Sequence, residues 1–403
     1  MKQAGSFATD VEARRDDLVA LRRDFHQHPE LSFDERRTSE IIADRLHKAG
    51  LEVRTGIART GVIGVLRGDQ PGRTIAWRAD IDALPLDETL DLPFRSSTKD
   101  VMHACGHDGH TAVGITMAEV LAARRGTLPG TIVFLFQPAE EVFGGAAPMI
   151  EAGALDDPHV DEVFGLHFTT RTQTGLVAVR PGPVLASADF FDVDVRGEGG
   201  HGAYPHLSVD PITVAANVTL GLSHLVAREV AAHHTAVLTV GQITGGTKHN
   251  IIPAVATMRG SIRAFDPGVR AQLKRRLADY ARDIARAYRA DAAVTFQADG
   301  CPAVVNHEAP TAFVADRVAA TMGADTVTTD ATSMASDDVS LFLQKRPGCY
   351  FFIGAAPDSG PPRPHHAPEF EMNERALPIG LRAGLEVVSA ALSSGLAGRP
   401  AGR

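Results

Sequence analysis

The 403-residue sequence predicts an α/β protein, in which a mostly parallel sheet flanked by helices carries an inserted ferredoxin-like α+β domain. Three observations lead to this prediction. Helical patterns alternate with short apolar runs in the first third of the chain, as in parallel sheets covered by helices. The segment 186–300 changes to a βαββαβ order. The length also exceeds that of one ordinary hydrophobic core, so two domains are expected.

Two helices are expected before the first strand. Apolar residues recur at helical spacing ahead of Pro29, and this proline ends the first helix. Ser32 and Glu35 resemble a capping box, which would open the second helix. Gly50 is expected to end that helix.

Short apolar runs at 62–66, 74–78 and 131–136 predict buried strands, and a further helix is expected over 111–125. In open parallel sheets, ligands bind beyond the carboxyl ends of the strands. Polar residues that follow or end the predicted strands are therefore expected at one edge of the sheet. They are Asp80, Asp82, Glu140, Glu141 and His167.

The segment 186–300 forms one split βαββαβ unit in this prediction. Alternating apolar and polar residues predict its first strand, and Asp210-Pro211 opens its first helix as N-cap and first-turn proline. The main domain would then consist of residues 1–185 and 301–403. The remaining elements are expected at 236–244, 254–265, 267–289 and 293–297.

Metal-ligating groups are concentrated between His103 and His110, where three histidines, one cysteine and one aspartate fall within eight residues. Thiolate and imidazole groups at this density suit a zinc- or manganese-type ion better than a hydrophobic core. Cys105 and His107 are spaced to converge on one ion. The flanking His103, Asp108 and His110 are expected to orient the ligands.

Glu140 and Glu141 follow the apolar run 132–136, so the acidic doublet is expected at the end of a buried strand. Carboxylates in such a place need cations or hydrogen bonds. One of them can bind metal while its neighbour stays free as a general base. Asp80 and Asp82 also follow an apolar run, although this pair is equally compatible with a turn. These pieces predict one metal-centred hydrolytic site.

Composition and charge limit the expected partners. The chain is 44% hydrophobic and 22% charged, as in soluble globular proteins, and its net charge of −9 argues against nucleic acid. No signal-peptide core and no run of about 18 apolar residues is found, so we expect no membrane segment. Three cysteines argue against a disulfide framework and favour the cytoplasm.

Together, the motifs resemble those of the N-acyl-amino-acid amidohydrolases of the co-catalytic zinc metallopeptidase superfamily. The branch is that of hippurate hydrolases, indoleacetyl-amino-acid hydrolases and N-acetyldiaminopimelate deacetylases. The resemblance runs from about Arg22 to Ala391. It is carried by FHQHPE (25–30), WRADIDALP (77–85), HACGHDGH (103–110), QPAEE (137–141), GLH (165–167), GGHGAYPH (199–206) and HAPEF (366–370).

The resemblance implies two divalent metal ions in each subunit, with zinc, manganese and cobalt as candidates. The ligands that it implies are Cys105, His107, Glu141, His167 and His366. It makes Glu140 the general base and Asp82 the residue that orients a group of the metal site. Asp80 stands where other branches carry a histidine ligand, so its role stays open. The implied reaction is hydrolysis of an N-acyl-L-amino acid, with an N-acetyl, N-benzoyl or similar acyl group, to a carboxylic acid and a free amino acid.

The resemblance also assigns a role to the inserted domain. His201, Asn250 and Arg263 match residues that bind the carbonyl and carboxylate of the substrate, and the first two act across a dimer in the family. We therefore expect a homodimer, with a tetramer left open, in which the inserted domain serves as dimerisation and lid domain. Two segments depart from the family pattern and leave the acyl group and the amino acid undefined. They are Ser336-Asp337-Asp338 and Val142-Phe143-Gly144-Gly145.

Three alternatives stay open. The first is a dipeptidase or carboxypeptidase activity on the same scaffold. The second is a metal-independent hydrolase with Cys105 as nucleophile, paired with His107 or His110, which requires a helix N-terminus at the cysteine. The third is a non-catalytic binding protein with a structural zinc site. Structural sites are closed by cysteine and histidine alone, whereas this set is rich in carboxylates.

Overall fold

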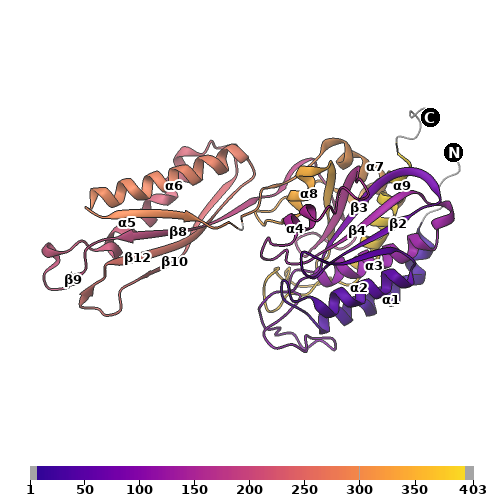
Figure 1. Cartoon of the computed structure of the whole chain (residues 1–403), viewed down its shortest axis with the longest axis horizontal. Coiled ribbons are helices and arrows are strands. Elements are labelled where there is room, and N and C mark those ends of the chain that lie inside the picture. Colours follow the sequence, from indigo (N-terminus) through magenta and orange to yellow (C-terminus); the bar gives the residue numbers. More distant parts are fainter. Residues whose placement is uncertain (1–6, 299, 395–403) are drawn as a thin grey trace. The chain divides into compact units, whose positions relative to one another are not determined.

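The computed structural model describes residues 7–298 and 300–394. The chain forms two compact units, which are described separately (Figure 1). Unit 1 consists of Met1–Gly182, Val305–Ala331 and Asp338–Arg403. Unit 2 consists of Pro183–Val304 and Thr332–Asp337. The strands β7 (Gly182–Leu185) and β14 (Val304–Asn306) lie where the chain passes from one unit to the other.

Unit 1 is built on an eight-stranded sheet of order β1-β2-β4-β3-β5-β16-β6-β15. Its centre, from β4 through β3 and β5 to β16, is parallel, which confirms the predicted fold class. The edge strands β1 and β2 are antiparallel, because a short turn joins them and leaves no room for a crossover. The strands are β1 (Glu52–Ile57), β2 (Gly61–Arg67), β3 (Gln70–Asp80), β4 (Pro129–Gln137), β5 (Glu162–Thr169), β6 (Val177–Ala178), β15 (Val327–Thr328) and β16 (Gly348–Gly354).

Helices cover this sheet, and α1, α3 and α9 pack on one another. By length and composition alone, helix α9 could cross a membrane. However, 67% of its 18 residues are buried inside the protein, as in the core helix of a globular protein. The helices of unit 1 are α1 (Ala8–Gln27), α2 (Arg36–Lys48), α3 (His107–Ala122), α4 (Ala146–Glu151), α7 (Glu308–Met322), α8 (Val339–Lys345) and α9 (Ala376–Ser393), with short 3-10 turns η1 (Arg125–Thr127) and η4 (Ala324–Thr326).

The predicted capping box at the start of α2 is wrong. Glu30 takes the capping role, since its carboxylate accepts hydrogen bonds from the Arg37 N–H (3.0 Å) and the Thr38 N–H (2.8 Å). The side chains of Ser32 and Glu35 make no cap and instead reach other parts of unit 1. Sequence spacing identified a capping pattern but could not show where these side chains find better partners.

Helix α3 starts four residues earlier than expected, at His107 instead of residue 111. Gly106 precedes it with a φ of +94°, which a glycine adopts without strain, so the chain turns into the helix directly after Cys105. The segment 103–110, which is predicted to bind metal, therefore runs into a helix N-terminus.

Unit 2 contains a four-stranded antiparallel sheet of order β10-β12-β8-β13, and its elements follow one another as βαββαβ. Asp210 and Asp266 cap its two long helices through the Ile212 N–H (3.0 Å) and the Val269 N–H (2.8 Å). The elements are β8 (Ser187–Arg196), β9 (Gly200–His201), η2 (Pro205–Leu207), α5 (Pro211–His224), the π-helical turn η3 (Leu225–Glu229), β10 (Ala236–Gly245), β11 (Ile251–Ile252), β12 (Val255–Ala264), α6 (Pro267–Ala287) and β13 (Asp291–Phe296).

Replacement of Glu30 by alanine tests the cap of α2. Because two backbone N–H groups lose their acceptor, we expect Glu30→Ala to lower the free energy of unfolding by about 1 kcal/mol. Urea denaturation followed by circular dichroism measures this change. Asp34→Ala, at a neighbouring exposed position, is the control and should leave the free energy of unfolding unchanged. Equal effects of the two substitutions would contradict the assignment.

Candidate active site

Five side chains predicted as ligands lie together at the carboxyl edge of the unit 1 sheet. The Cys105 Sγ is 3.5 Å from the His167 Nε2, and the His107 Nε2 is 3.9 Å from the Glu141 Oε1. The His366 Nε2 is 3.4 Å from the Glu141 Oε2. Cys105 belongs both to a possible metal-holding group with His107 and His167 and to one with Glu141 and His366. The five residues thus form one continuous cluster.

Hydrogen bonds fix which nitrogen two of these histidines present to the cluster. The His107 Nδ1–H donates to the carbonyl oxygen of Asp82 (2.9 Å), and the His167 Nδ1–H donates to the carbonyl oxygen of Phe168 (2.6 Å). Because a carbonyl only accepts, each Nδ1 carries a proton, which leaves Nε2 as the nitrogen available to a cation. Both Nε2 atoms face the cluster, which is the arrangement of metal-bound imidazoles.

Buried atoms without a hydrogen bond support a metal at this place. Within the described part of the chain, the His107 Nε2 and the Glu141 Oε1 have no hydrogen-bond partner. A buried polar atom that lacks a partner costs free energy, and a cation that displaces any proton on the His107 Nε2 would satisfy both atoms at once. The donor set of one thiol, imidazoles and carboxylates suits zinc, manganese or cobalt. The residues present therefore fit divalent metal ions.

The raised pKa values of two predicted ligands in the metal-free site also support a bound cation. Burial raises the pKa of Glu141 to about 8, and repulsion by Asp82 and Asp80 adds to this effect. Burial and the charge of Glu141 also raise the pKa of the Cys105 thiol well above its usual range. These groups hold protons that a cation would displace on binding.

Asp80 makes two strong contacts in the site. It accepts from Arg78 Nη1 (2.5 Å) and from His110 Nδ1 (2.5 Å), and the Phe168 N–H donates to the other nitrogen of His110 (3.0 Å). Both nitrogens of His110 are therefore engaged. Although burial opposes it, the charge of Arg78 holds the pKa of Asp80 well below its usual range. An ionised Asp80 lies 3.6 Å from the His107 Nε2, so it adds negative charge to the ligand cluster.

Glu140 and Glu141 lie on a turn that buried carboxylates anchor. The carboxylate of Asp82 accepts from the Glu141 N–H (3.1 Å), and the Ser32 hydroxyl donates to the same carboxylate (2.7 Å). Gly145 closes the turn, since a Cβ there would lie 1.7 Å from the Pro138 oxygen. Glu140 is 5% exposed, and its Oε2 lies 3.9 Å from the His107 Nε2. This side chain is thus held at the ligand cluster.

Two residues expected to orient ligands make no hydrogen bond to a predicted ligand within the described residues. Asp108 forms an ion pair with Arg22, whose Nε lies 2.8 Å from the Asp108 Oδ2, and it contacts the His26 Nδ1 (2.8 Å), so it ties α3 to α1. Burial lowers the pKa of His103 to about 4, and within the described residues its ring nitrogens have no hydrogen-bond partner. The ring of His110, the third flanking residue, lies against two predicted ligands, with its centroid 5.4 Å from that of His107 and 4.7 Å from that of His167. Spacing along the chain could not reveal this, because the first turn of α3 directs successive side chains to different faces.

His366 rather than His365 lies at Glu141. His366 adopts a φ of +60°, and its N–H donates to the Ala104 oxygen (2.9 Å). The neighbouring His365 accepts from the Thr170 N–H (3.5 Å). Burial lowers the pKa of His365 to about 3, so it is neutral. The backbone contact at Ala104 connects the loop of His366 directly to the segment that carries Cys105.

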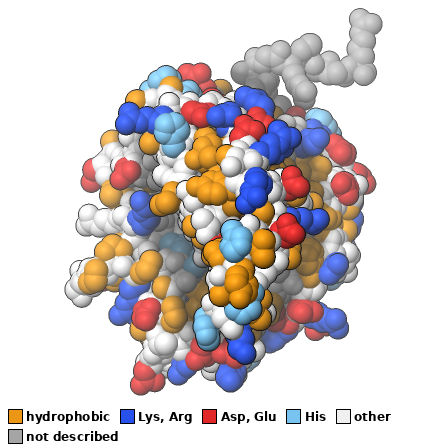
Figure 2. Space-filling view, turned by 90° about the vertical axis from the view of Figure 1, so that its left-hand side faces the viewer, with side chains coloured by type: hydrophobic (Ala, Val, Ile, Leu, Met, Phe, Trp, Pro, Cys, Tyr) orange, Lys and Arg blue, Asp and Glu red, His pale blue; other side chains and the backbone are white. Residues whose placement is uncertain are grey.

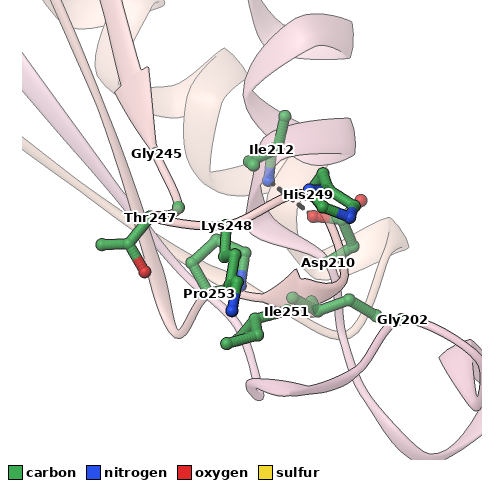
Figure 3. Close-up of a pocket in the computed structure, with 11 residues that line it drawn as sticks. Gly202, Asp210, Ile212, Gly245, Thr247, Lys248, His249, Ile251 and Pro253 are labelled. Atoms are coloured by element: carbon green, nitrogen blue, oxygen red, sulfur yellow. Dashed lines mark hydrogen bonds between the residues drawn. The ribbon is translucent and has the colours of Figure 1, made fainter.

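The three substrate-binding candidates lie in unit 2. His201 pairs with Ile251 between β9 and β11, and the Asn250 oxygen accepts from the Gly202 N–H (2.9 Å), so His201 and Asn250 are neighbours. A cavity of about 420 Å³ beside them is lined by residues that include Lys248 (Figure 3). Arg263 lies on β12 and donates to the Met334 oxygen (2.9 Å) and to the Ser336 hydroxyl (3.0 Å).

Unit 2 also exposes large apolar side chains. Leu220 on α5 is 76% exposed, and Leu207 is 69% exposed. Figure 2 shows a face of the protein on which apolar side chains reach the surface between charged ones. Other exposed apolar residues of unit 2 are Tyr204, Ile212, Val237, Ile243, Ile251, Val255 and Tyr288.

The chain is similar in sequence and structure to known hydrolases of one peptidase family. A family model described as "Peptidase family M20/M25/M40" matches residues 76–390. The chain is 40% identical to thermostable carboxypeptidase 2 of Saccharolobus solfataricus over 93% of this chain and 95% of that one. It is 39% identical to N-acetyl-L-cysteine deacetylase of Bacillus subtilis over 89% and 84%. The crystal structure of the Bacillus subtilis YXEP protein, described as a dinuclear metal-binding peptidase of the M20 family, superposes with a TM-score of 0.81 at 34% identity, over 94% and 99% of the two chains.

The raised pKa of Glu141 predicts a pH dependence in the metal-free protein. The folded chain keeps this proton up to about pH 8, whereas the unfolded chain loses it near 4.5. The stabilising contribution of the bound proton is therefore fully present below pH 4.5 and is lost as the pH rises through about 8. Urea unfolding of chelator-treated protein should show wild type losing stability relative to Glu141→Gln across this interval. Parallel pH profiles of the two proteins would disprove the assignment.

Proposed function

The chain belongs to peptidase family M20/M25/M40, and on this premise we propose that it is a metal-dependent amidohydrolase of N-acyl-L-amino acids. Its products would be a carboxylic acid and a free amino acid. One observation carries the proposal. A cluster of thiol, imidazole and carboxylate groups, buried or half-buried except at His366, includes polar atoms without hydrogen-bond partners, and the additional carboxylate of Glu140 lies beside it.

Two divalent ions, with zinc, manganese and cobalt as candidates, would be held by Cys105, His107, Glu141, His167 and His366. When bound, they supply a Lewis acid and lower the pKa of a water molecule. The thiol has to stay reduced to act as a ligand, so we still expect a reducing cytoplasm.

Glu140 is the base in this proposal. Its Oε2 would take the proton of the attacking water and then deliver it to the nitrogen of the leaving amine. Asp82 acts through His107, because its carbonyl oxygen accepts from the His107 Nδ1–H and its carboxylate lies 3.3 Å from the same nitrogen. This contact keeps the Nε2 directed at the cluster.

The substrate class rests on the names of relatives and on the site. The N-acetyl-L-cysteine deacetylase supports N-acyl amino acids as substrates. The thermostable carboxypeptidase, which is 40% identical, favours a peptide substrate as the second candidate. A panel of N-acetyl, N-benzoyl, N-indoleacetyl and long-chain N-acyl amino acids, assayed beside dipeptides and N-blocked peptides with each metal, separates the two.

The Cys105 nucleophile is the less favoured alternative. Helix α3 does begin at His107, as that mechanism requires. Yet burial and the charge of Glu141 raise the pKa of the thiol, whereas a nucleophile needs a lowered one. The alternative also gives no role to Glu140, Glu141 or His366.

Substrate binding by His201, Asn250 and Arg263 remains part of the proposal, as does a homodimer through unit 2. The exposed apolar residues of unit 2 support an interface there, because large apolar side chains in water are typical of association surfaces. In a dimer, His201 and Asn250 of one subunit would complete the site of the other.

Substitution of the base separates chemistry from binding. We expect Glu140→Gln to lower kcat by on the order of 100-fold or more, because the amide cannot accept the proton. Metal content, measured by elemental analysis, should remain that of wild type. Glu151→Gln, an exposed position at the end of α4, is the matched control and should keep full activity. Full hydrolysis by metal-loaded Glu140→Gln would exclude this residue as the base.

Complementation tests the shared site. Glu140→Gln and His201→Ala should each be inactive, yet a mixed dimer contains one intact site if His201 acts on the partner. Co-expression should therefore restore about a quarter of wild-type activity under random pairing. No recovery in dimers that contain both chains, verified by differential tags, would show that His201 does not act across an interface.

A further inference from the structure

Glu35 is a buried carboxylate at the start of α2 whose side chain does not cap the helix. It is fully buried, and its Oε1 accepts from the Ala139 N–H (2.9 Å). Its Oε2 contacts the Thr60 hydroxyl (2.5 Å). The capping role belongs to Glu30, so Glu35 contributes nothing to α2 through its side chain.

The partner of Glu35 has an unusual backbone conformation. Ala139 has a φ of +52°, in the left-handed region, where a residue with a Cβ loses about 1–2 kcal/mol. It directly precedes Glu140, so its φ and ψ decide where that carboxylate points. The Gly144 N–H donates to the Ala139 oxygen (2.9 Å), so both sides of this residue are hydrogen-bonded. A strained turn of this kind persists only when its surroundings hold it.

Three buried carboxylates hold the backbone of the Glu140 turn. Asp82 accepts from the Glu141 N–H (3.1 Å), and Asp338 accepts from the Ala146 N–H (3.1 Å). Both also act elsewhere: Asp82 at His107, and Asp338 at Gln137. The Glu35 carboxylate accepts from Ala139 on the turn and from Thr60, and neither of these partners is a predicted ligand.

We propose that Glu35 is a positioning residue that holds Ala139 in its left-handed conformation and thereby aims the Glu140 carboxylate at the ligand cluster. This inference rests on the proposed function, since it assigns Glu35 to the residue that acts there as base. Burial of a carboxylate is costly, and an apolar side chain would fill the same space at lower cost if packing were its only task.

The chemistry of the contact predicts which substitution is tolerated. Burial raises the pKa of Glu35, and the charge of Asp82 adds to the shift, so a neutral side chain suits the position. The amide of glutamine can accept from the Ala139 N–H and donate to the Thr60 hydroxyl. Glu35→Gln should thus preserve the turn, whereas Glu35→Ala removes the acceptor.

Kinetics of Glu35→Ala, Glu35→Gln and Glu30→Ala test the proposal. We expect Glu35→Ala to lower kcat by on the order of 10- to 100-fold with KM and metal affinity unchanged, because the base is misplaced. Glu35→Gln should keep most of kcat. Glu30→Ala is the matched control: it removes a carboxylate from the same helix start, so it should lower stability but not the kcat of the folded protein.

Glu35→Ala introduced into the Ala139→Gly variant distinguishes a positioning role of Glu35 from a general loss of structure. Glycine adopts a positive φ without strain, so the turn in Ala139→Gly depends less on Glu35. In a double-mutant cycle, Glu35→Ala should reduce kcat less in Ala139→Gly than in wild type. Additive effects, or an unchanged kcat of folded Glu35→Ala, would overturn the proposal.

A crystal structure of Glu35→Ala tests the inference without any activity. We expect Ala139 to leave the left-handed region and the Glu140 Oε2 to move from its place 3.9 Å from the His107 Nε2. An unchanged turn would refute the positioning role. If wild type hydrolyses no compound of the panel, the proposed function fails, and this crystallographic result still decides the role of Glu35.

Discussion

Mutual repulsion between buried carboxylates is the constraint on which this site depends. Asp80, Asp82, Glu140 and Glu141 lie within reach of one imidazole, that of His107, in a place from which water is largely excluded. Burial together with the charges of Asp82 and Asp80 makes an ionised Glu141 unfavourable, and the raised pKa of Glu141 reflects this cost. Cations between these side chains would remove the cost. The fold therefore has to hold like charges close together, and it does so through the backbone.

That support comes from hydrogen bonds rather than from packing alone. Carbonyl oxygens hold the Nδ1 atoms of His107 and His167, so that both histidines direct Nε2 to the cluster. Arg78 keeps Asp80 ionised. On the turn that carries Glu140, carboxylates hold backbone N–H groups at three positions. His107, His167 and Glu141 thus depend on partners that the metal would not touch, which is the usual way in which metal sites keep their geometry.

Much of this was predictable from sequence because it follows from the order of the elements. The rule that ligands gather beyond the carboxyl ends of parallel strands brings Asp82, Glu140 and His167 together without knowledge of any side-chain contact. Individual side-chain directions were not predictable. Ser32 and Glu35 have the spacing of a capping box, yet one bonds to Asp82 and the other to Ala139. Contacts between residues so distant along the chain leave no periodic signal, and the left-handed φ of Ala139 has none either, since glycine would be expected there.

The central claim is that distant segments of unit 1 enclose two cations beside an unligated carboxylate. Anomalous diffraction from crystals grown with manganese or zinc tests it most directly. The account predicts two anomalous peaks bounded by Cys105, His107, Glu141, His167 and His366, with the Glu140 carboxylate beside them but not coordinated. A single ion bound only by cysteine and histidine, or no ion within reach of Cys105 and His366, would contradict the account.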